Sequence, residues 1–222
     1  MKNLYSRVIK RVVDLLFLIL FSPIWMPLVL VLSLIVKLTS PGPVLFKQER
    51  IGKRRSIFTI YKFRSMYCTA PKDTPTHMLE NPEIYITPIG RFLRKFSLDE
   101  LPQILNIIRG ELTLVGPRPA LWNQDDLIAE REKYGANDVT PGLTGLAQTK
   151  GRDELPIEIK ARYDGEYCAK ISFLTDIKIL FLTVFAVFKS EGVVEGGTGV
   201  VRSGDVEGGT GIVRSADDEG DS

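Results

Sequence analysis

The sequence has very few of the side chains on which metal centres, disulfide frameworks and serine-type hydrolases depend. It contains one histidine, His77, which stands in a polar, proline-rich stretch, and two cysteines, Cys68 and Cys168. Neither a C-x-x-C pair nor metal-type spacing occurs, so the composition argues against a disulfide framework and is consistent with a reducing compartment. A Ser-His-Asp or Cys-His mechanism would depend on His77 alone, which argues against that class of enzyme.

The formal net charge of +2 conceals an uneven distribution along the 222 residues. Residues 192–222 carry two Arg against seven Asp and Glu, a net of −5, so residues 1–191 carry +7. A basic body suits phosphate groups or an anionic membrane surface. The acidic stretch holds a Gly-rich direct repeat, Val194–Asp205 and Val206–Asp217, and two copies are too few for a repeat architecture. We expect residues 192–222 to be a flexible acidic tail without a catalytic role.

One long uncharged run, Leu15–Val36, lies near the start of the chain. As a helix, its 22 residues would extend about 33 Å, so an ordinary spanning helix is the simplest interpretation. Ser22-Pro23 and Pro27 favour a bent segment instead, because proline interrupts helical hydrogen bonding. Cations on both flanks place both ends on the cytoplasmic side by the positive-inside rule. The run lacks a signal-peptide cleavage site, so we expect it to be retained, with Asp14 near the head groups at its entry.

The rest of the body is predicted to combine helices with short strands. Val44–Phe46 and Ile57–Tyr61 have the composition of strands and flank a basic turn, Gly52–Arg55. Thr140–Gly145 is a turn-rich loop, and the apolar run Ile171–Phe188 predicts a helix that is either a core helix or an interfacial one. Because no G-x-G-x-x-G motif follows a strand, we expect an α+β, mostly helical fold without a Rossmann sheet.

Two adjacent carboxylates, Asp99 and Glu100, stand at the predicted start of a short helix. The apolar residues of Ile104–Ile108 follow them, and Gly110 has the position of a residue that ends the helix. Unpaired N–H groups and the positive end of the helix dipole favour negative charge there. The competing interpretation is structural, because Ser97 and Glu100 have the spacing of a capping box.

Cations on both sides of the carboxylate pair favour a phosphate site. Arg94 and Lys95 precede the pair, and Arg118 follows it within Gly116-Pro117-Arg118-Pro119. Proline restricts the backbone on both sides of Arg118 and holds it in an extended segment, although a plain rigid turn has the same pattern. Guanidinium groups grip phosphoryl oxygens in two-point contacts, so this arrangement suits chemistry on phosphate.

Together these motifs resemble those of the bacterial sugar transferases, the small monotopic phosphoglycosyl transferases. The stretch GRFLRKFSLDELPQILNIIRGELTLVGPRP, residues 90–119, is similar to the core motif of that family, and the likeness covers most of residues 1–189. The other matching stretches are the segment around Ser22-Pro23, Pro43–Gly52, Phe58–Met66, and Pro141–Gln148 with Gly151-Arg152. Several long motifs in one order make the resemblance specific.

The resemblance implies an organisation in three parts. Residues 1–38 would form a re-entrant membrane helical hairpin. Residues 39–191 would form a small cytoplasmic catalytic domain with short strands and interfacial helices in contact with membrane lipids, and residues 192–222 lie outside the likeness. The expected location is the bacterial inner membrane, with the catalytic domain on its cytoplasmic face.

The resemblance also implies an activity. A sugar-1-phosphate would move from a nucleoside diphosphate sugar, expected to be a UDP-sugar, to a polyprenyl phosphate such as undecaprenyl phosphate, with release of UMP. Asp99 would attack the β-phosphorus to form a covalent phosphosugar intermediate. Glu100 would assist as a Mg²⁺ contact or as a base, and both carboxylates would ligate Mg²⁺.

Further roles carry over to basic and amide side chains. The residues assigned to phosphate oxygens are Lys62, Arg94 and Arg118. The residues assigned to the nucleotide are Gln148 and Arg152. Thr149-Lys150 departs from the family pattern between them.

Two other functions stay open from the residues alone. A membrane-bound scaffold would use Asp99 and Glu100 only as a helix cap, and a nucleotide-sugar hydrolase would release UMP without a lipid acceptor. No nucleic-acid partner is expected, and a homodimer is left open. The sequence does not identify the sugar, nor the pathway among O-antigen, capsule, exopolysaccharide and glycoprotein assembly.

Overall fold

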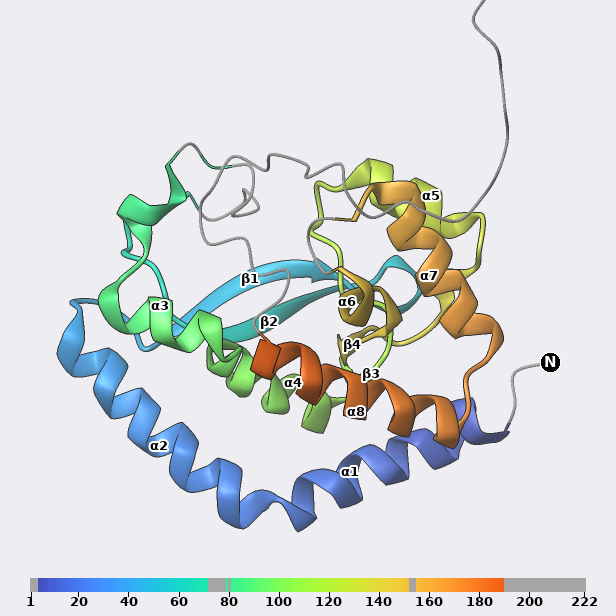
Figure 1. The fold of residues 1–222 in the computed structure, drawn as a ribbon, viewed down its shortest axis with the longest axis horizontal. Helices are drawn as coiled ribbons and strands as arrows, with labels where there is room; N and C mark the ends of the chain where they lie inside the picture. The colour runs from blue at the N-terminus through green and yellow to red at the C-terminus, as the bar shows by residue number, and fades with distance from the viewer. Residues whose placement is uncertain (1–3, 72–78, 80, 152–154, 190–222) are drawn as a thin grey trace, which may run out of the picture.

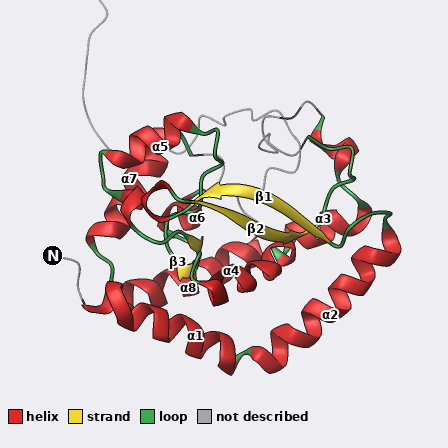
Figure 2. Ribbon diagram, turned by 180° about the vertical axis from the view of Figure 1, so that it is seen from behind, coloured by secondary structure: helices red, strands yellow, loops and turns green. Residues whose placement is uncertain are grey.

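The computed structural model describes residues 4–71, 79, 81–151 and 155–189. Two long N-terminal helices lie along one side of a small body, with a β-hairpin and short helices above them (Figures 1 and 2). The α-helices are α1 (Lys10–Leu20), α2 (Ser22–Thr39), α3 (Pro88–Lys95), α4 (Ile104–Arg109), α5 (Asp125–Glu132), α6 (Leu146–Lys150), α7 (Ile157–Ala169) and α8 (Phe173–Lys189). The strands are β1 (Leu45–Ile51), β2 (Ile57–Phe63), β3 (Thr113–Val115) and β4 (Gly142–Thr144). The predicted mostly helical α+β fold is confirmed.

The N-terminal helices are interrupted where the sequence predicted a break. Helix α1 ends at Leu20 with Phe21 as its C-cap, and α2 begins at Ser22 with Pro23 in its first turn. Ser22 Oγ donates to Ile19 O at 2.7 Å, so the hydroxyl partly replaces the lost helical bonding. Pro27 lies inside α2 and does not end it. Helix α2 is long and apolar enough to cross a membrane by length and composition, and the re-entrant path stays a prediction.

Two small sheets occur in the described part of the chain. Strands β1 and β2 pair antiparallel from Leu45 opposite Phe63 to Ile51 opposite Ile57, which confirms the predicted hairpin around the basic turn. Strands β3 and β4 pair in parallel, with Thr113 opposite Gly142. The prediction of a plain loop over residues 140–145 was therefore wrong, because three of its residues pair with a segment that is distant in sequence. In this part of the chain no Rossmann sheet is present.

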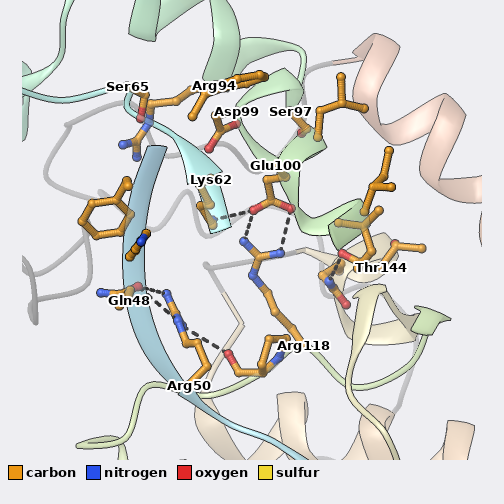
Figure 3. A pocket seen from close by; sticks show the side chains of 18 of the residues that line it. Gln48, Arg50, Lys62, Ser65, Arg94, Ser97, Asp99, Glu100, Arg118 and Thr144 are labelled. Atoms are coloured by element: carbon orange, nitrogen blue, oxygen red, sulfur yellow. Dashed lines mark hydrogen bonds and ion pairs between the residues drawn. The ribbon is translucent and has the colours of Figure 1, made fainter. Parts of the chain in front are cut away.

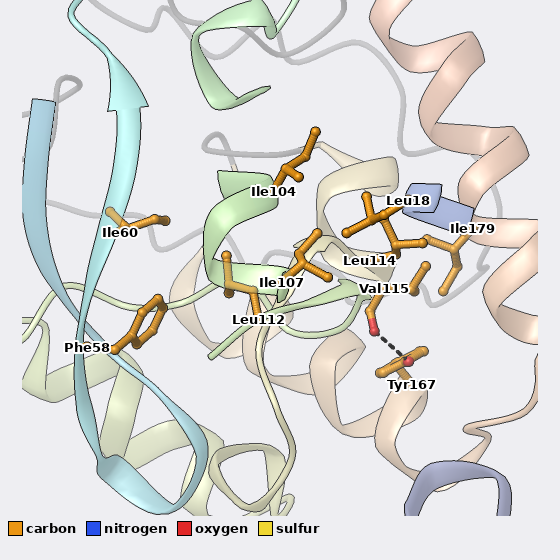
Figure 4. Close-up of a cluster of buried hydrophobic side chains, with 10 residues drawn as sticks. All are labelled: Leu18, Phe58, Ile60, Ile104, Ile107, Leu112, Leu114, Val115, Tyr167 and Ile179. Carbon is orange, nitrogen blue, oxygen red and sulfur yellow. Dashed lines mark hydrogen bonds between the residues drawn. The ribbon is translucent and has the colours of Figure 1, made fainter. Parts of the chain in front are cut away.

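The apolar core includes residues from the N-terminal helices. Its main cluster joins α1, β2, α4, β3, α7 and α8 (Figure 4): Leu18, Phe58, Ile60, Ile104, Ile107, Leu112, Leu114, Val115, Tyr167 and Ile179. A second cluster joins Leu32 and Val36 of α2 to Phe63 of β2 and Leu93 of α3. Helices α1 and α2 are thus packed into the folded body, although they are also the most apolar part of the chain.

Polar side chains of α1 also reach into the body. Asp14, 3% exposed, accepts hydrogen bonds from Thr113 Oγ1 and from Leu114 N at 3.4 Å. Thr113 and Leu114 of β3 thus supply buried donors for this carboxylate, and the expected position of Asp14 near the head groups stays a prediction. Lys10 forms an ion pair with the buried Asp176 of α8, and Arg11 donates to the carbonyl oxygens at the end of α4.

Helix α8 has a buried side and exposed apolar sides, and its contact with a membrane interface stays a prediction. Asp176 and Ile179 are buried, whereas Leu174, Phe181 and Phe185 on other sides of the helix are 78%, 65% and 65% exposed. Further exposed apolar side chains lie on α3 and α4: Phe92, Phe96, Leu105 and Ile108. Exposed apolar surface of this extent is typical of a face that contacts a membrane or a partner.

Asn106 provides a test of how α4 is attached to the hairpin. Its buried amide accepts from Tyr61 N at 3.1 Å and donates to Thr59 O and Glu111 Oε2, each at 2.7 Å. Asn106→Ala would leave buried backbone groups of β2 unpaired, at a cost of about 2 kcal/mol. We expect the midpoint of thermal unfolding in nanodiscs to fall by roughly 4–8 °C. The half-buried Asn137→Ala is the matched control, and equal midpoints for the two variants would contradict this account.

Candidate active site

The carboxylate pair lies in a 3₁₀ turn, Leu98–Gln103, which leads directly into α4. Gly110 ends α4 with a φ of 83°, as predicted. The capping-box alternative is wrong, because Ser97 has a φ of 54° and its side chain makes no capping hydrogen bond. Glu100 instead extends toward two cations from other parts of the fold (Figure 3).

Glu100 is the anion at the centre of the site. Lys62 Nζ, at the end of β2, donates to Glu100 Oε1 at 2.7 Å. The guanidinium of Arg118 donates to both carboxylate oxygens, with Nη1 at 3.2 Å from Oε2. Burial would raise the pKa of Glu100, but Arg118 and Lys62 more than offset it and hold that pKa well below its usual range. Glu100 is therefore a permanent anion that fixes the positions of both cations.

Asp99 has a different environment, although it is the adjacent residue. It is 9% exposed and lines the same cavity, and no hydrogen bond to its carboxylate occurs among the residues that the structure describes. Burial, opposed by Lys62 and reinforced by the charge of Glu100, raises the pKa of Asp99 to about 6. A carboxylate without a protein donor retains both oxygens for a ligand or a reacting atom.

The cavity joins these groups to the other predicted residues. Its volume is about 1000 Å³, at the upper end of the range for small-molecule sites. Arg94 of α3 lines the wall near Asp99 (Figure 3) and lowers the pKa of that carboxyl. Gln148 of α6 lines another wall and donates from Nε2 to Leu143 O at 3.2 Å. The prediction for Arg152 lies outside the described residues.

Two further residues belong to the site and were not predicted. Arg50 of β1 donates from Nη2 to Gln48 Oε1 at 2.6 Å and from Nη1 to Pro119 O at 3.1 Å, and both side chains line the cavity (Figure 3). Residues 48 and 50 share one face of a strand, so the alternation of β1 was the available signal. They extend the polar wall away from the carboxylates.

Magnesium binding by Asp99 and Glu100 stays a prediction, and the two carboxylates differ in the oxygens that they could offer to the ion. Mg²⁺ is commonly held by one or two carboxylates, with substrate phosphate oxygens and water as its other ligands. Asp99 has free oxygens for this role, whereas both oxygens of Glu100 already accept from cations. Among the described residues, no group of three or more His, Cys, Asp or Glu side chains could form a protein-only metal site.

Fold and site together combine a cavity lined by two carboxylates and several cations with an exposed apolar surface. The comparison with known proteins is more specific: residues 5–190 match the model of the bacterial sugar transferase family, and the chain belongs to that family. The resemblance seen in the sequence motifs is confirmed.

Curated relatives differ in the sugar that they handle. An uncharacterised sugar transferase, EpsL, of Bacillus subtilis is 41% identical over 186 residues, which cover 84% of this chain and 90% of the relative. A UDP-glucose:undecaprenyl-phosphate glucose-1-phosphate transferase of Caulobacter vibrioides is 39% identical over 183 residues, 79% of this chain and 68% of the relative. An N-acetylgalactosamine enzyme of the same type from Aeromonas hydrophila is 35% identical over 190 residues, 83% of this chain but 44% of the relative.

The opposite pKa directions of the two carboxyls can be tested without substrate or metal. We expect Asp99 to titrate near pH 6, well above an ordinary Asp, and Glu100 to stay ionised through the accessible acid range. Glu100→Gln removes a neighbouring negative charge, so the pKa of Asp99 should fall. Carboxyl ¹³C shifts of labelled protein would measure both titrations, with Asp99→Asn assigning the signal. A pKa of about 4 for Asp99 in the unsubstituted protein, the ordinary value, would contradict this electrostatic account.

Proposed function

We propose that the chain is a phosphoglycosyl transferase that moves a sugar-1-phosphate from a UDP-sugar to undecaprenyl phosphate. The products would be undecaprenyl-diphospho-sugar and UMP, and the reaction would begin the assembly of a bacterial glycoconjugate. Family membership and the activities for which the relatives are named support the general reaction. The observation that carries the proposal is Asp99, a buried carboxylate without a protein donor inside a cationic cavity.

In the first step, an oxygen of Asp99 would attack the β-phosphorus of the UDP-sugar. A bond forms between that oxygen and phosphorus, and the bond to the bridging oxygen breaks, so the electron pair leaves with UMP. Asp99 then carries the sugar phosphate as an acyl phosphate. In the second step, a phosphate oxygen of the lipid would attack the same phosphorus and restore the free carboxylate. Covalent catalysis thus divides one displacement between two anions into two steps.

The cations of the site would hold phosphate oxygens and offset their charge. Lys62 and Arg118 are already oriented by Glu100, and Arg94 lies on the Asp99 side of the cavity. Glu100 would thus act mainly as a positioning residue for both cations. Mg²⁺ on Asp99 and substrate oxygens would, when bound, neutralise charge that develops during phosphoryl transfer.

The nucleotide would occupy the polar wall of the cavity. Gln48 and Arg50 lie there. Gln148 lines the cavity on the β4 side, where it donates to Leu143 O, and Gln148 and Arg152 keep their proposed role by resemblance. The membrane would be met by α1, α2 and the exposed apolar side chains of α3, α4 and α8. With α1 and α2 as a re-entrant hairpin, the cavity would open on the cytoplasmic face, at the height of lipid phosphates.

The first test is UMP release by the full chain in nanodiscs with Mg²⁺. A panel of UDP-sugars would be supplied with and without undecaprenyl phosphate. We expect multiple turnovers with one sugar only when the lipid is present, which would also identify the donor. Full-rate release without lipid would favour a nucleotide-sugar hydrolase, and no release with any nucleotide sugar would contradict the proposal.

A second test addresses the nucleophile. Without lipid, the unsubstituted protein should release about one equivalent of UMP and gain the mass of a sugar phosphate. Asp99→Asn should show neither the burst nor the adduct, with turnover lower by roughly 10³-fold or more, because an amide cannot attack phosphorus. The exposed Asp125→Asn on α5 is the matched control. Near-normal UMP release by Asp99→Asn would remove Asp99 from the mechanism.

A further inference from the structure

The cavity has walls of two different chemistries. On one side of the Glu100–Arg118 pair lie Gln48 and Arg50, and on the other lies Thr144 (Figure 3). Thr144 Oγ1 is 2.7 Å from Thr183 Oγ1 of α8, so this second side of the cavity continues onto α8. We call the part beyond Thr144 the apolar lobe. Its lining residues are Phe17, Leu18, Phe21, Trp25, Leu180 and Ala186.

The apolar lobe lies at the junction of α1 and α2. Trp25 of α2 donates from its indole nitrogen to Leu18 O of α1 at 2.8 Å, which fixes the ring across the helix break. The rings of Phe17 and Phe21 are 4.4 Å apart, and both remain more than a third exposed. Trp25 and Leu180 also pack against the main core cluster. The walls of the lobe are therefore held in place by the core.

The side chains that line each side of the cavity determine which ligand that side can bind. A nucleotide sugar is polar along its whole length, so its burial against Phe17, Trp25 and Leu180 would leave hydroxyl groups unpaired. An amphiphile with an anionic head and an apolar chain matches both the cations and the apolar lobe of the cavity. Its head would reach Lys62 and Arg94, and its chain would lie in the apolar lobe. Charge complementarity at one end and continuity with the proposed membrane surface at the other favour this occupant.

We propose that the apolar lobe binds the first isoprene units of the polyprenyl phosphate acceptor, with its phosphate beside Lys62 and Arg94. This inference rests on the proposed function and adds where the acceptor chain lies. Donor nucleotide and acceptor chain then occupy opposite sides of the Glu100–Arg118 pair and meet at Asp99. The residues of the α1–α2 break determine which lipid chains are accepted.

The two half-reactions separate this inference from the proposed function. Ala186→Phe places a ring in the lobe, and Ala129→Phe, at an exposed position of α5, is the matched control. We expect Ala186→Phe to raise the KM for undecaprenyl phosphate by about tenfold or more, because it overfills the lobe. The lipid-independent UMP burst reports whether the variant is folded. An unchanged KM with a normal burst would overturn the lobe assignment, whereas no burst in the unsubstituted protein would overturn the proposed function instead.

A labelling experiment on the unsubstituted protein avoids dependence on any variant. A prenyl phosphate with a diazirine in its first isoprene units would be photolysed with the protein in nanodiscs, and labelled peptides would be identified. We expect label on residues 17–25 and 180–186, suppressed by unlabelled undecaprenyl phosphate and not by phosphatidic acid. Label confined to the exposed apolar residues of α3 and α4, or equal suppression by phosphatidic acid, would overturn the proposal.

Discussion

The carboxylate of Glu100 is the interaction on which the geometry of the site depends. It joins β2 through Lys62 and the segment after β3 through Arg118, while its own backbone belongs to the turn before α4. The half-buried cations Lys62 and Arg118 would repel each other, and the anion that lies between them offsets this repulsion. Glu100 thereby satisfies the charges that could otherwise pair with Asp99. Two neighbouring residues of similar chemistry thus acquire opposite properties from their surroundings.

The cavity is lined by elements that are far apart in the sequence. Its polar wall is supplied by β1, by α5 and by the segment before α5, and its apolar lobe by α1, α2 and α8. Parallel pairing of β3 with β4 places Thr144 next to the end of β3 and opposite α8. The three-residue strands β3 and β4 therefore lie where the polar wall of the cavity meets the apolar lobe.

Much of the local structure could be predicted from sequence because its causes are local. Proline and serine at residues 22–23 predicted the helix interruption, and Gly110 predicted the end of α4. The strand-like composition on both sides of a basic turn predicted β1 and β2. The partners of charged residues could not be predicted in this way. Asp14 and Thr113 are 99 positions apart, and Lys62 and Glu100 are 38 apart.

Within the site, the ion-pair partners of Glu100 could not be predicted from sequence either. A spacing of three residues from Ser97 is compatible with a helix cap, and only the tertiary structure shows that Glu100 extends to Lys62 and Arg118 instead. The motif resemblance identified both cations, but it did not predict that each contacts Glu100, because it carries no geometry. Strands β3 and β4 were not predicted, because three residues are too few to show a hydrophobic periodicity that would distinguish a strand from a turn.

The attachment of α1 and α2 to the body has a consequence for how the protein can be divided. Val36 packs on Phe63 and Leu93, Lys10 neutralises the buried Asp176, and Asp14 satisfies Thr113. Removing everything before β1 to obtain a water-soluble fragment would therefore open both apolar clusters and leave a buried carboxylate without its ammonium partner. Helices α1 and α2 and the rest of the body therefore form a single packed unit, and we expect a fragment without these helices to unfold or aggregate.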